Sequence, residues 1–132
     1  MKRIFLLIAA FICFFSVKAQ EAIIEPADTT AKAKIVFENV VHDFANIKVG
    51  SDGTCVFKFK NEGTIPLVIT RVAASCGCTT PSWTREPVLP GISGEIKVKY
   101  DTNRMGTFSK SITVVSNAET SSVLLKITGN VQ

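Results

Sequence analysis

The sequence has 132 residues, 46% of them hydrophobic, which is enough for one domain with a single core. Its 15 basic and 11 acidic residues give a formal charge of +4, but Lys2, Arg3 and Lys18 all lie in the first nineteen residues. The rest of the chain holds 12 basic and 11 acidic residues, a net charge of +1, which excludes a strongly basic protein that binds nucleic acid or an anionic membrane surface.

The N-terminal stretch MKRIFLLIAAFICFFSVKAQ has the pattern of a cleaved secretory signal. Lys2 and Arg3 form its positive start, and Ile4–Phe15 is an apolar run of twelve residues, shorter than the roughly twenty that a membrane-spanning helix needs. Residues 17–19 place small side chains at the two positions that matter for cleavage. We therefore predict that residues 1–19 are removed and that the chain is exported, to the periplasm or out of the cell, without stable membrane insertion.

Residues 20–33, QEAIIEPADTTAKA, are mostly small and polar, contain Pro26 and show no sustained hydrophobic period. Such a composition is typical of a flexible linker between a cleavage point and a folded domain. We place the folded domain at residues 34–132.

Within 34–132 the hydrophobic residues recur with a period of two, which is the pattern of half-buried strands. The residues that share a face within each stretch are Cys55, Phe57 and Phe59; Ile96, Val98 and Tyr100; Phe108, Ile112 and Val114; and Val123, Leu125 and Ile127. Turn-forming sequences such as Asn61-Glu62-Gly63 and Pro90-Gly91 separate the stretches. The sequence therefore predicts an all-β, immunoglobulin-like antiparallel β-sandwich of about seven strands, with Pro81 on an edge strand.

Six stretches of the domain occur in a recognisable order. They are HDFANIKVG (His42–Gly50), FKFKNEGTIPLVI (Phe57–Ile69), SCGCTTPSW (Ser75–Trp83), LPGISGEIKVKYD (Leu89–Asp101), GTFSKSITVVSN (Gly106–Asn117) and ITGNV (Ile127–Val131). Together they resemble the bacterial domain-of-unknown-function family 1573, a set of exported immunoglobulin-like domains, over about residues 35–131. SCGCT and the tryptophan that follows it are the most specific part of the resemblance, which implies a fold and a compartment but brings no activity.

Ala45 departs from this family pattern, in which a glycine follows the His-Asp-Phe run. We expect the backbone at this position to remain extended.

The Cys76-Gly77-Cys78 motif is the main candidate for chemistry, and three interpretations of it stay open. In an extended strand the two Cα atoms lie about 6.6 Å apart, close to the upper limit for a disulfide, so a bridge needs a bend that Gly77 permits. Without that bend, the two sulfurs face one side and could hold copper or zinc, or act as a redox pair. An exported chain with three cysteines after its signal favours a structural role, as a bridge or as buried thiols.

Cys55 and His42 are the remaining soft ligands for a metal site, with His42 the possible third ligand to Cys76 and Cys78. Cys55 shares its face with Phe57, however, and is therefore expected in the core as a free thiol or disulfide candidate.

His42 and Asp43 are adjacent in a predicted strand, so their side chains face opposite sides and cannot form a catalytic pair. Trp83 is expected to cover one end of the core, with exposure as a recognition residue the alternative. No residue is assigned a catalytic role.

We therefore predict an exported, non-catalytic immunoglobulin-like domain that binds or supports other proteins of the cell envelope, without a cofactor. Its partner is expected to be an envelope or extracellular protein, or a second copy of the chain, reached through a sheet edge or through the end with the cysteines and Trp83. The alternative is a thiol-based protein that binds copper or zinc, or carries out redox chemistry, with Cys76 and Cys78.

Overall fold

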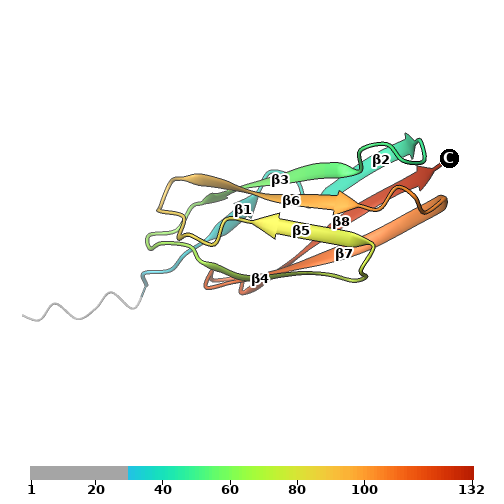
Figure 1. Ribbon diagram of the computed structural model, residues 1–132. Helices are drawn as coiled ribbons and strands as arrows, with labels where there is room; N and C mark the ends of the chain where they lie inside the picture. The colour runs from blue at the N-terminus through green and yellow to red at the C-terminus, as the bar shows by residue number, and fades with distance from the viewer. Residues whose placement is uncertain (1–29) are drawn as a thin grey trace, which may run out of the picture.

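A computed structural model describes residues 30–132, which form eight β-strands (Figure 1). The predicted signal, residues 1–19, and residues 20–29 of the predicted linker lie outside the described residues. The strands are β1 (Ile35–Phe37), β2 (Val41–Ile47), β3 (Thr54–Asn61), β4 (Ile69–Ala74), β5 (Thr79–Trp83), β6 (Ser93–Tyr100), β7 (Gly106–Ser116) and β8 (Ser122–Val131).

The strands form two four-stranded sheets that face each other across one core. One sheet has the order β1-β3-β6-β5 and the other has the order β2-β8-β7-β4. All strand pairs are antiparallel except β2 with β8, which is parallel. The chain passes from the first sheet to the second between β1 and β2. The predicted all-β, immunoglobulin-like sandwich is confirmed, with eight strands in place of about seven.

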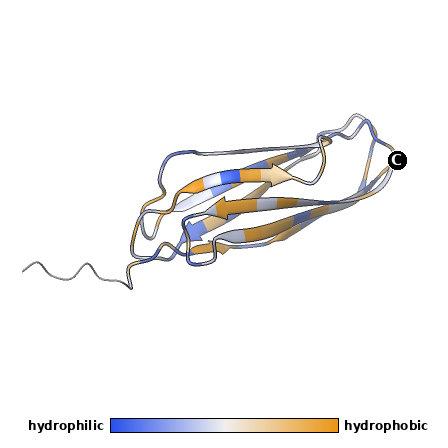
Figure 2. Cartoon of the chain, turned by 90° about the horizontal axis from the view of Figure 1, so that it is seen from below, coloured by the Kyte–Doolittle hydropathy of each residue, from blue (hydrophilic) through white to orange (hydrophobic). Residues whose placement is uncertain are grey.

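Alternating side chains produce this two-layer structure, and Figure 2 shows the resulting change of hydropathy along the strands. In β3 and β6, Cys55 pairs with Val98 and Phe57 pairs with Ile96, and all four side chains are buried. The residues between them point outward into water. Largest among the fully buried side chains are Leu67, Ile96, Ile112, Leu125 and Ile127.

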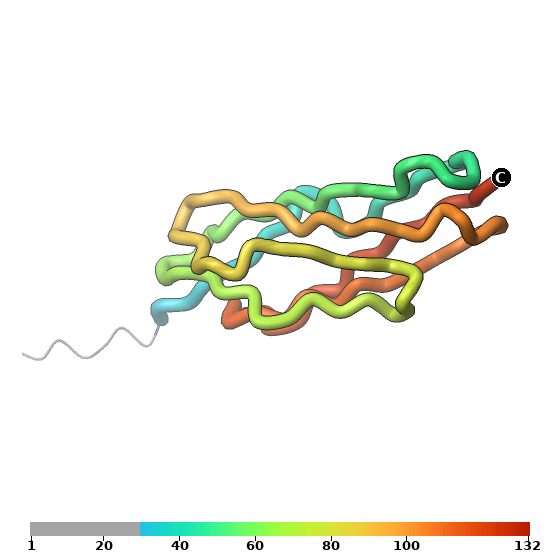
Figure 3. The backbone as a smooth tube through the Cα atoms, in the orientation of Figure 1, coloured from blue at the N-terminus to red at the C-terminus, as the bar shows by residue number. Residues whose placement is uncertain are grey.

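The packed structure begins at Ala33, where the predicted linker ends. Ala33 is completely buried and pairs with Ala118 in an isolated parallel bridge. The described chain starts at one end of the elongated sandwich and finishes at the other, as Figure 3 shows. No helix in residues 30–132 is long and apolar enough to cross a membrane.

Asn61 organises the end of the sandwich where the described chain starts. Its side chain is completely buried, and its Nδ2 donates hydrogen bonds to the carbonyl groups of Ile65 and Val88, at 2.8 and 2.9 Å. Its Oδ1 accepts from the backbone N–H groups of Lys34 and Gly63, at 3.3 and 2.9 Å. Because a buried amide is costly unless it is fully bonded, these contacts fix the approach to β1 and two loops in one arrangement.

The backbone at Ala45 is not extended, which corrects the expectation from the sequence. Ala45 has a φ of 53°, in the left-handed region, and lies in a bulge where the β2–β8 register shifts between Asp43 and Asn46. The carboxylate of Asp43 accepts a hydrogen bond from the N–H of Ala45 at 2.9 Å and supports this turn. A side chain with a Cβ is disfavoured in such a conformation, which explains why a glycine is expected there.

We predict that Ala45→Gly raises the free energy of unfolding by about 1 kcal/mol, because glycine adopts a positive φ without the steric cost that alanine carries. Urea titration of both proteins measures the change. Ala73→Gly, in a regular part of β4, is the matched control and should lower the same quantity by about 0.5–1 kcal/mol. Equal destabilisation by both substitutions would contradict the strained conformation at Ala45.

Candidate functional site

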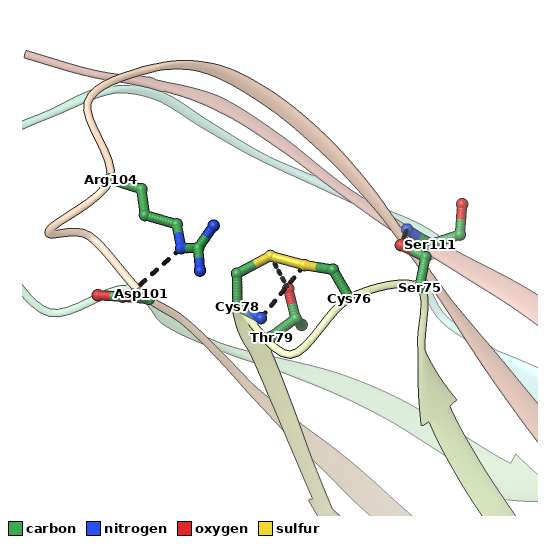
Figure 4. The surroundings of a disulfide bond; sticks show 7 residues. All are labelled: Ser75, Cys76, Cys78, Thr79, Asp101, Arg104 and Ser111. Atoms are coloured by element: carbon green, nitrogen blue, oxygen red, sulfur yellow. Dashed lines mark hydrogen bonds and ion pairs between the residues drawn. A yellow bond between two sulfur atoms is a disulfide. The ribbon is translucent and has the colours of Figure 1, made fainter.

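The Cys-Gly-Cys motif lies in the turn between β4 and β5, which joins the edge of one sheet to the edge of the other. Cys76 and Cys78 form a disulfide, with their Cα atoms 5.3 Å apart (Figure 4). This separation is shorter than the roughly 6.6 Å of an extended chain, so the turn has bent at Gly77 as a bridge requires. The third cysteine, Cys55, is free and buried.

Hydrogen bonds on both sides hold this turn independently of the sulfurs. The N–H of Ser75 donates to the carbonyl of Ser111 at 2.9 Å, and the N–H of Ser111 donates to Oγ of Ser75 at 3.2 Å. On the other side, the N–H of Asp101 donates to the carbonyl of Cys78 at 2.8 Å. A three-residue disulfide loop removes little chain entropy, corresponding to about 1.5 kcal/mol, so the bridge contributes only a small part of the stability.

The two sulfurs have different surroundings. Cys78 is only 5% exposed and belongs to the core, whereas Cys76 is half-buried at its rim. The N–H of Cys78 donates to Sγ of Cys76 at 3.2 Å, and Oγ1 of Thr79 lies 3.8 Å from Sγ of Cys78. Cys76 is therefore the more exposed of the two cysteines.

Arg104, in the loop between β6 and β7, extends its guanidinium toward the disulfide (Figure 4). Its Nε lies 3.6 Å from Oδ2 of Asp101, whose backbone N–H bonds Cys78. A positive charge beside sulfur stabilises a thiolate. Arg104 could not be identified from the sequence, because it is 26 positions from Cys78 and only the β5–β6 pairing brings the two loops together.

His42 lies away from the cysteines, although it was a possible third metal ligand in the sequence-based prediction. It is in β2, at one edge of its sheet, whereas the disulfide turn follows β4, at the opposite edge. The His42 ring contacts Phe44 edge-on, with 4.5 Å between the ring centroids. Residues 30–132 contain no group of three or more His, Cys, Asp or Glu side chains placed to hold a metal ion. Asp43 faces the other side of the strand and bonds Ala45.

Trp83 closes the gap between the two edge strands β4 and β5. It is half-buried against the core, and its Nε1 donates to the carbonyl of Ile69 in β4 at 3.4 Å. The guanidinium of Arg85 lies over the ring, 4.6 Å from its centroid. Pro81 lies in the middle of β5. The carbonyl of Cys78 points toward β6, and because backbone groups alternate in direction along a strand, the nitrogen of Pro81 points away from β6. Proline has no N–H, so the outer edge of β5 has no hydrogen-bond donor at this position. These two residues block the addition of a strand on this side.

An apolar patch lies at the β2 edge of the sheet β2-β8-β7-β4, the edge opposite to β4. It consists of Val41 and Leu124, which are 53% and 60% exposed. Val41 pairs with Lys126, and Leu124 precedes Lys126 by two positions on the same outer face. This patch could not be predicted from the sequence, because Leu124 lies in a run of hydrophobic residues, Val123-Leu124-Leu125, where alternation alone does not reveal which side chain is exposed.

A family model described as "Protein of unknown function (DUF1573)" matches residues 35–131 of the chain. Among solved structures, a protein of unknown function from Porphyromonas gingivalis W83 is similar, with 18% identity and a TM-score of 0.70 over 80% of this chain and 50% of that one. The chain thus spans about half the length of that protein. No match was found among curated proteins.

Two further structures share the fold at low identity. PapD-like domain 7 of human CEP192 has 9% identity and a TM-score of 0.65 over 86% of this chain and 96% of that domain. The YadV chaperone has 13% identity and a TM-score of 0.57 over 75% of this chain and 52% of the chaperone. Both share the sandwich fold of this chain.

Burial raises the pKa of the Cys55 thiol from 9.0 to about 11, because the thiolate would lose its hydration in the core. The thiol form therefore stabilises the folded state fully below pH 9, and this contribution is lost as the pH rises from 9 toward 11. We predict that the free energy of unfolding falls over this window by roughly 1–3 kcal/mol more in the natural protein than in Cys55→Ala. Urea titrations at several pH values measure both slopes, and parallel slopes would contradict the burial of Cys55.

Proposed function

The chain belongs to the DUF1573 family of proteins of unknown function, and from this premise we propose that it is an exported, non-catalytic module that binds another protein of the cell envelope. The fold supports a binding role, since one structural neighbour is a chaperone and another is a PapD-like domain. Likeness of fold does not select a partner, so the surface must identify the mode of binding.

The apolar patch at the β2 edge is the observation that carries this proposal. The outer face of the other sheet presents charged side chains along β3 and β6, namely Lys58, Lys60, Glu95, Lys97 and Lys99. The patch instead exposes two apolar side chains, Val41 and Leu124, with Lys126 opposite Val41 and Asp43 on the same face. An apolar centre with a charged rim is the composition of a protein-binding surface.

The backbone of β2 adds a second binding element next to the patch. The carbonyl of Val40 accepts a hydrogen bond from the N–H of Lys126, so Val40 turns its backbone groups toward β8. Because these groups alternate along a strand, those of Val41 and Asp43 point away from β8 at the sheet edge. We propose that the partner contributes an extended segment that pairs with this edge and places an apolar side chain against Leu124. The bulge at Ala45 limits the added strand to the first half of β2.

Two features support export. The predicted signal would deliver the chain to an oxidising compartment, and the Cys76–Cys78 disulfide is the form that cysteines take there. We expect the recovered protein to begin at Gln20 and to contain one disulfide and one free thiol.

Intact-mass analysis with and without reduction, followed by alkylation in denaturant, tests this expectation. Cleavage after Ala19, a mass increase of about two hydrogens on reduction, and one alkylated cysteine before reduction would support it. An unprocessed N-terminus on protein recovered from the cytoplasm, with three free thiols in residues 20–132, would contradict it.

The binding surface is tested by placing a photo-crosslinking amino acid at position 124 or, as a control, at position 56. Val56 is also exposed but lies on the outer face of the other sheet. Crosslinks from position 124 identify the partner, which is then purified for binding measurements. We predict that Leu124→Lys weakens its affinity at least tenfold, because the charge replaces the central apolar contact, while Val56→Lys changes it less than twofold. Both side chains are exposed, so neither substitution should unfold the domain. Equal effects of the two substitutions would overturn this surface.

A further inference from the structure

The disulfide has no evident part in the proposed binding surface, which lies at the other edge of the sheet, and this raises the question of its purpose. It closes a turn already held by backbone hydrogen bonds through Ser75 and Asp101. The eighteen buried hydrophobic residues of the described chain extend through both sheets, and only Cys78 among them takes part in the disulfide. A bridge with so small a structural effect can open without loss of the fold.

We propose that the Cys76–Cys78 disulfide is a thiol–disulfide exchange site at the surface of the domain, in which an external thiol attacks Cys76 and Cys78 is the leaving group. The reacting partner is a thiol or dithiol compound or protein. This inference goes beyond the proposed binding function and does not depend on it.

The direction of attack follows from the difference between the two sulfurs. Cys76 is half-buried at the rim of the sandwich, and neighbouring Gly77 is exposed, with open space around the position that a Cβ would occupy. Cys78 is in the core, so a nucleophile has no comparable access to it. Thiol–disulfide exchange needs an accessible sulfur for attack, and here Cys76 meets that condition.

Two polar groups offset part of the cost of leaving a thiolate on Cys78, which lies in the core. The lone pair of the external thiolate forms a new bond to Sγ of Cys76, and the electron pair of the old S–S bond moves to Sγ of Cys78. Oγ1 of Thr79, 3.8 Å away, can donate a weak hydrogen bond to this thiolate, and the guanidinium of Arg104 supplies positive charge nearby. Nε of Arg104 lies 3.6 Å from Oδ2 of Asp101, and both side chains are exposed.

A second thiol completes the exchange. It attacks the sulfur of the external group in the mixed disulfide, releases Cys76 as a thiolate and forms the external disulfide. The two thiolates of the protein take up protons from water, so the domain gains two electrons and two protons while two external thiols are oxidised to one disulfide. Run in reverse, the same steps oxidise the cysteine pair. Cys55 stays out of this reaction because it is buried in β3.

The first test follows reduction of the purified oxidised protein by dithiothreitol without denaturant. We predict a rate proportional to the dithiothreitol concentration and unchanged in 1 M urea, since attack occurs on the folded protein. A rate that is independent of dithiothreitol and rises with urea would show that the disulfide is reached only by unfolding, and would overturn the proposal.

The second test locates the attacked sulfur. Glutathione, a monothiol, should form a mixed disulfide that peptide mass spectrometry places on Cys76 at least ten times more often than on Cys78, with Cys55 unmodified. The variants Cys78→Ser and Cys76→Ser, each with one cysteine of the pair left, should show the same preference when they react with an aromatic disulfide reagent. Equal modification of Cys76 and Cys78 would contradict the assigned roles.

The third test concerns Arg104. Its replacement in Arg104→Gln should slow reduction by about three- to tenfold, and added salt should reduce the difference, because the effect is electrostatic. Arg85→Gln, which removes the guanidinium over Trp83, is the matched control and should leave the rate within about 1.5-fold. Equal rates for the natural protein and Arg104→Gln would overturn the role of Arg104, and equal slowing by both substitutions would show a non-specific charge effect.

Discussion

The packing of two pleated sheets against each other is the interaction on which the rest of the molecule depends. β3 and β6 in one layer and β7 and β8 in the other each direct every second side chain into the space between them. The buried side chains in this space are removed from water, which supplies the main stabilising free energy of a domain of this size. The edges, loops and turn cysteines are attached to this body and can differ in chemistry without altering it.

The β4–β5 side of the sandwich and the β2 edge offer different surfaces to a partner. At the β4–β5 side, Trp83 bonds the carbonyl of Ile69 and Pro81 removes an outward donor, so a further strand is disfavoured. At the β2 side, exposed Val41 and Leu124 accompany outward-facing backbone groups. The disulfide and Arg104 lie at the β4–β5 side. A partner segment at β2 and a thiol at Cys76 would thus use separate surfaces of one small body.

Much of this fold could be predicted from the sequence because a period of two depends on nothing beyond local order. The buried faces of β3, β6 and β8 follow directly from the alternation of hydrophobic residues around Phe57, Val98 and Leu125, respectively. Features that depend on contacts between distant segments could not be obtained in this way, such as the parallel β2–β8 pair and the approach of Arg104 to Cys78. The conformation of Ala45 was predicted wrongly, because a bulge arises from the register between two strands and its alanine carries no local signal for a positive φ.

Amide hydrogen exchange on the oxidised and the reduced protein tests most directly whether the packed layers, and not the cross-link, maintain the fold. If they do, the amides of β3, β6, β7 and β8 keep their protection after reduction, and faster exchange is confined to the β4–β5 turn and the facing loop at residues 101–105. Loss of protection throughout these four strands on reduction would show that the disulfide holds the sandwich together, and would contradict a self-sufficient core.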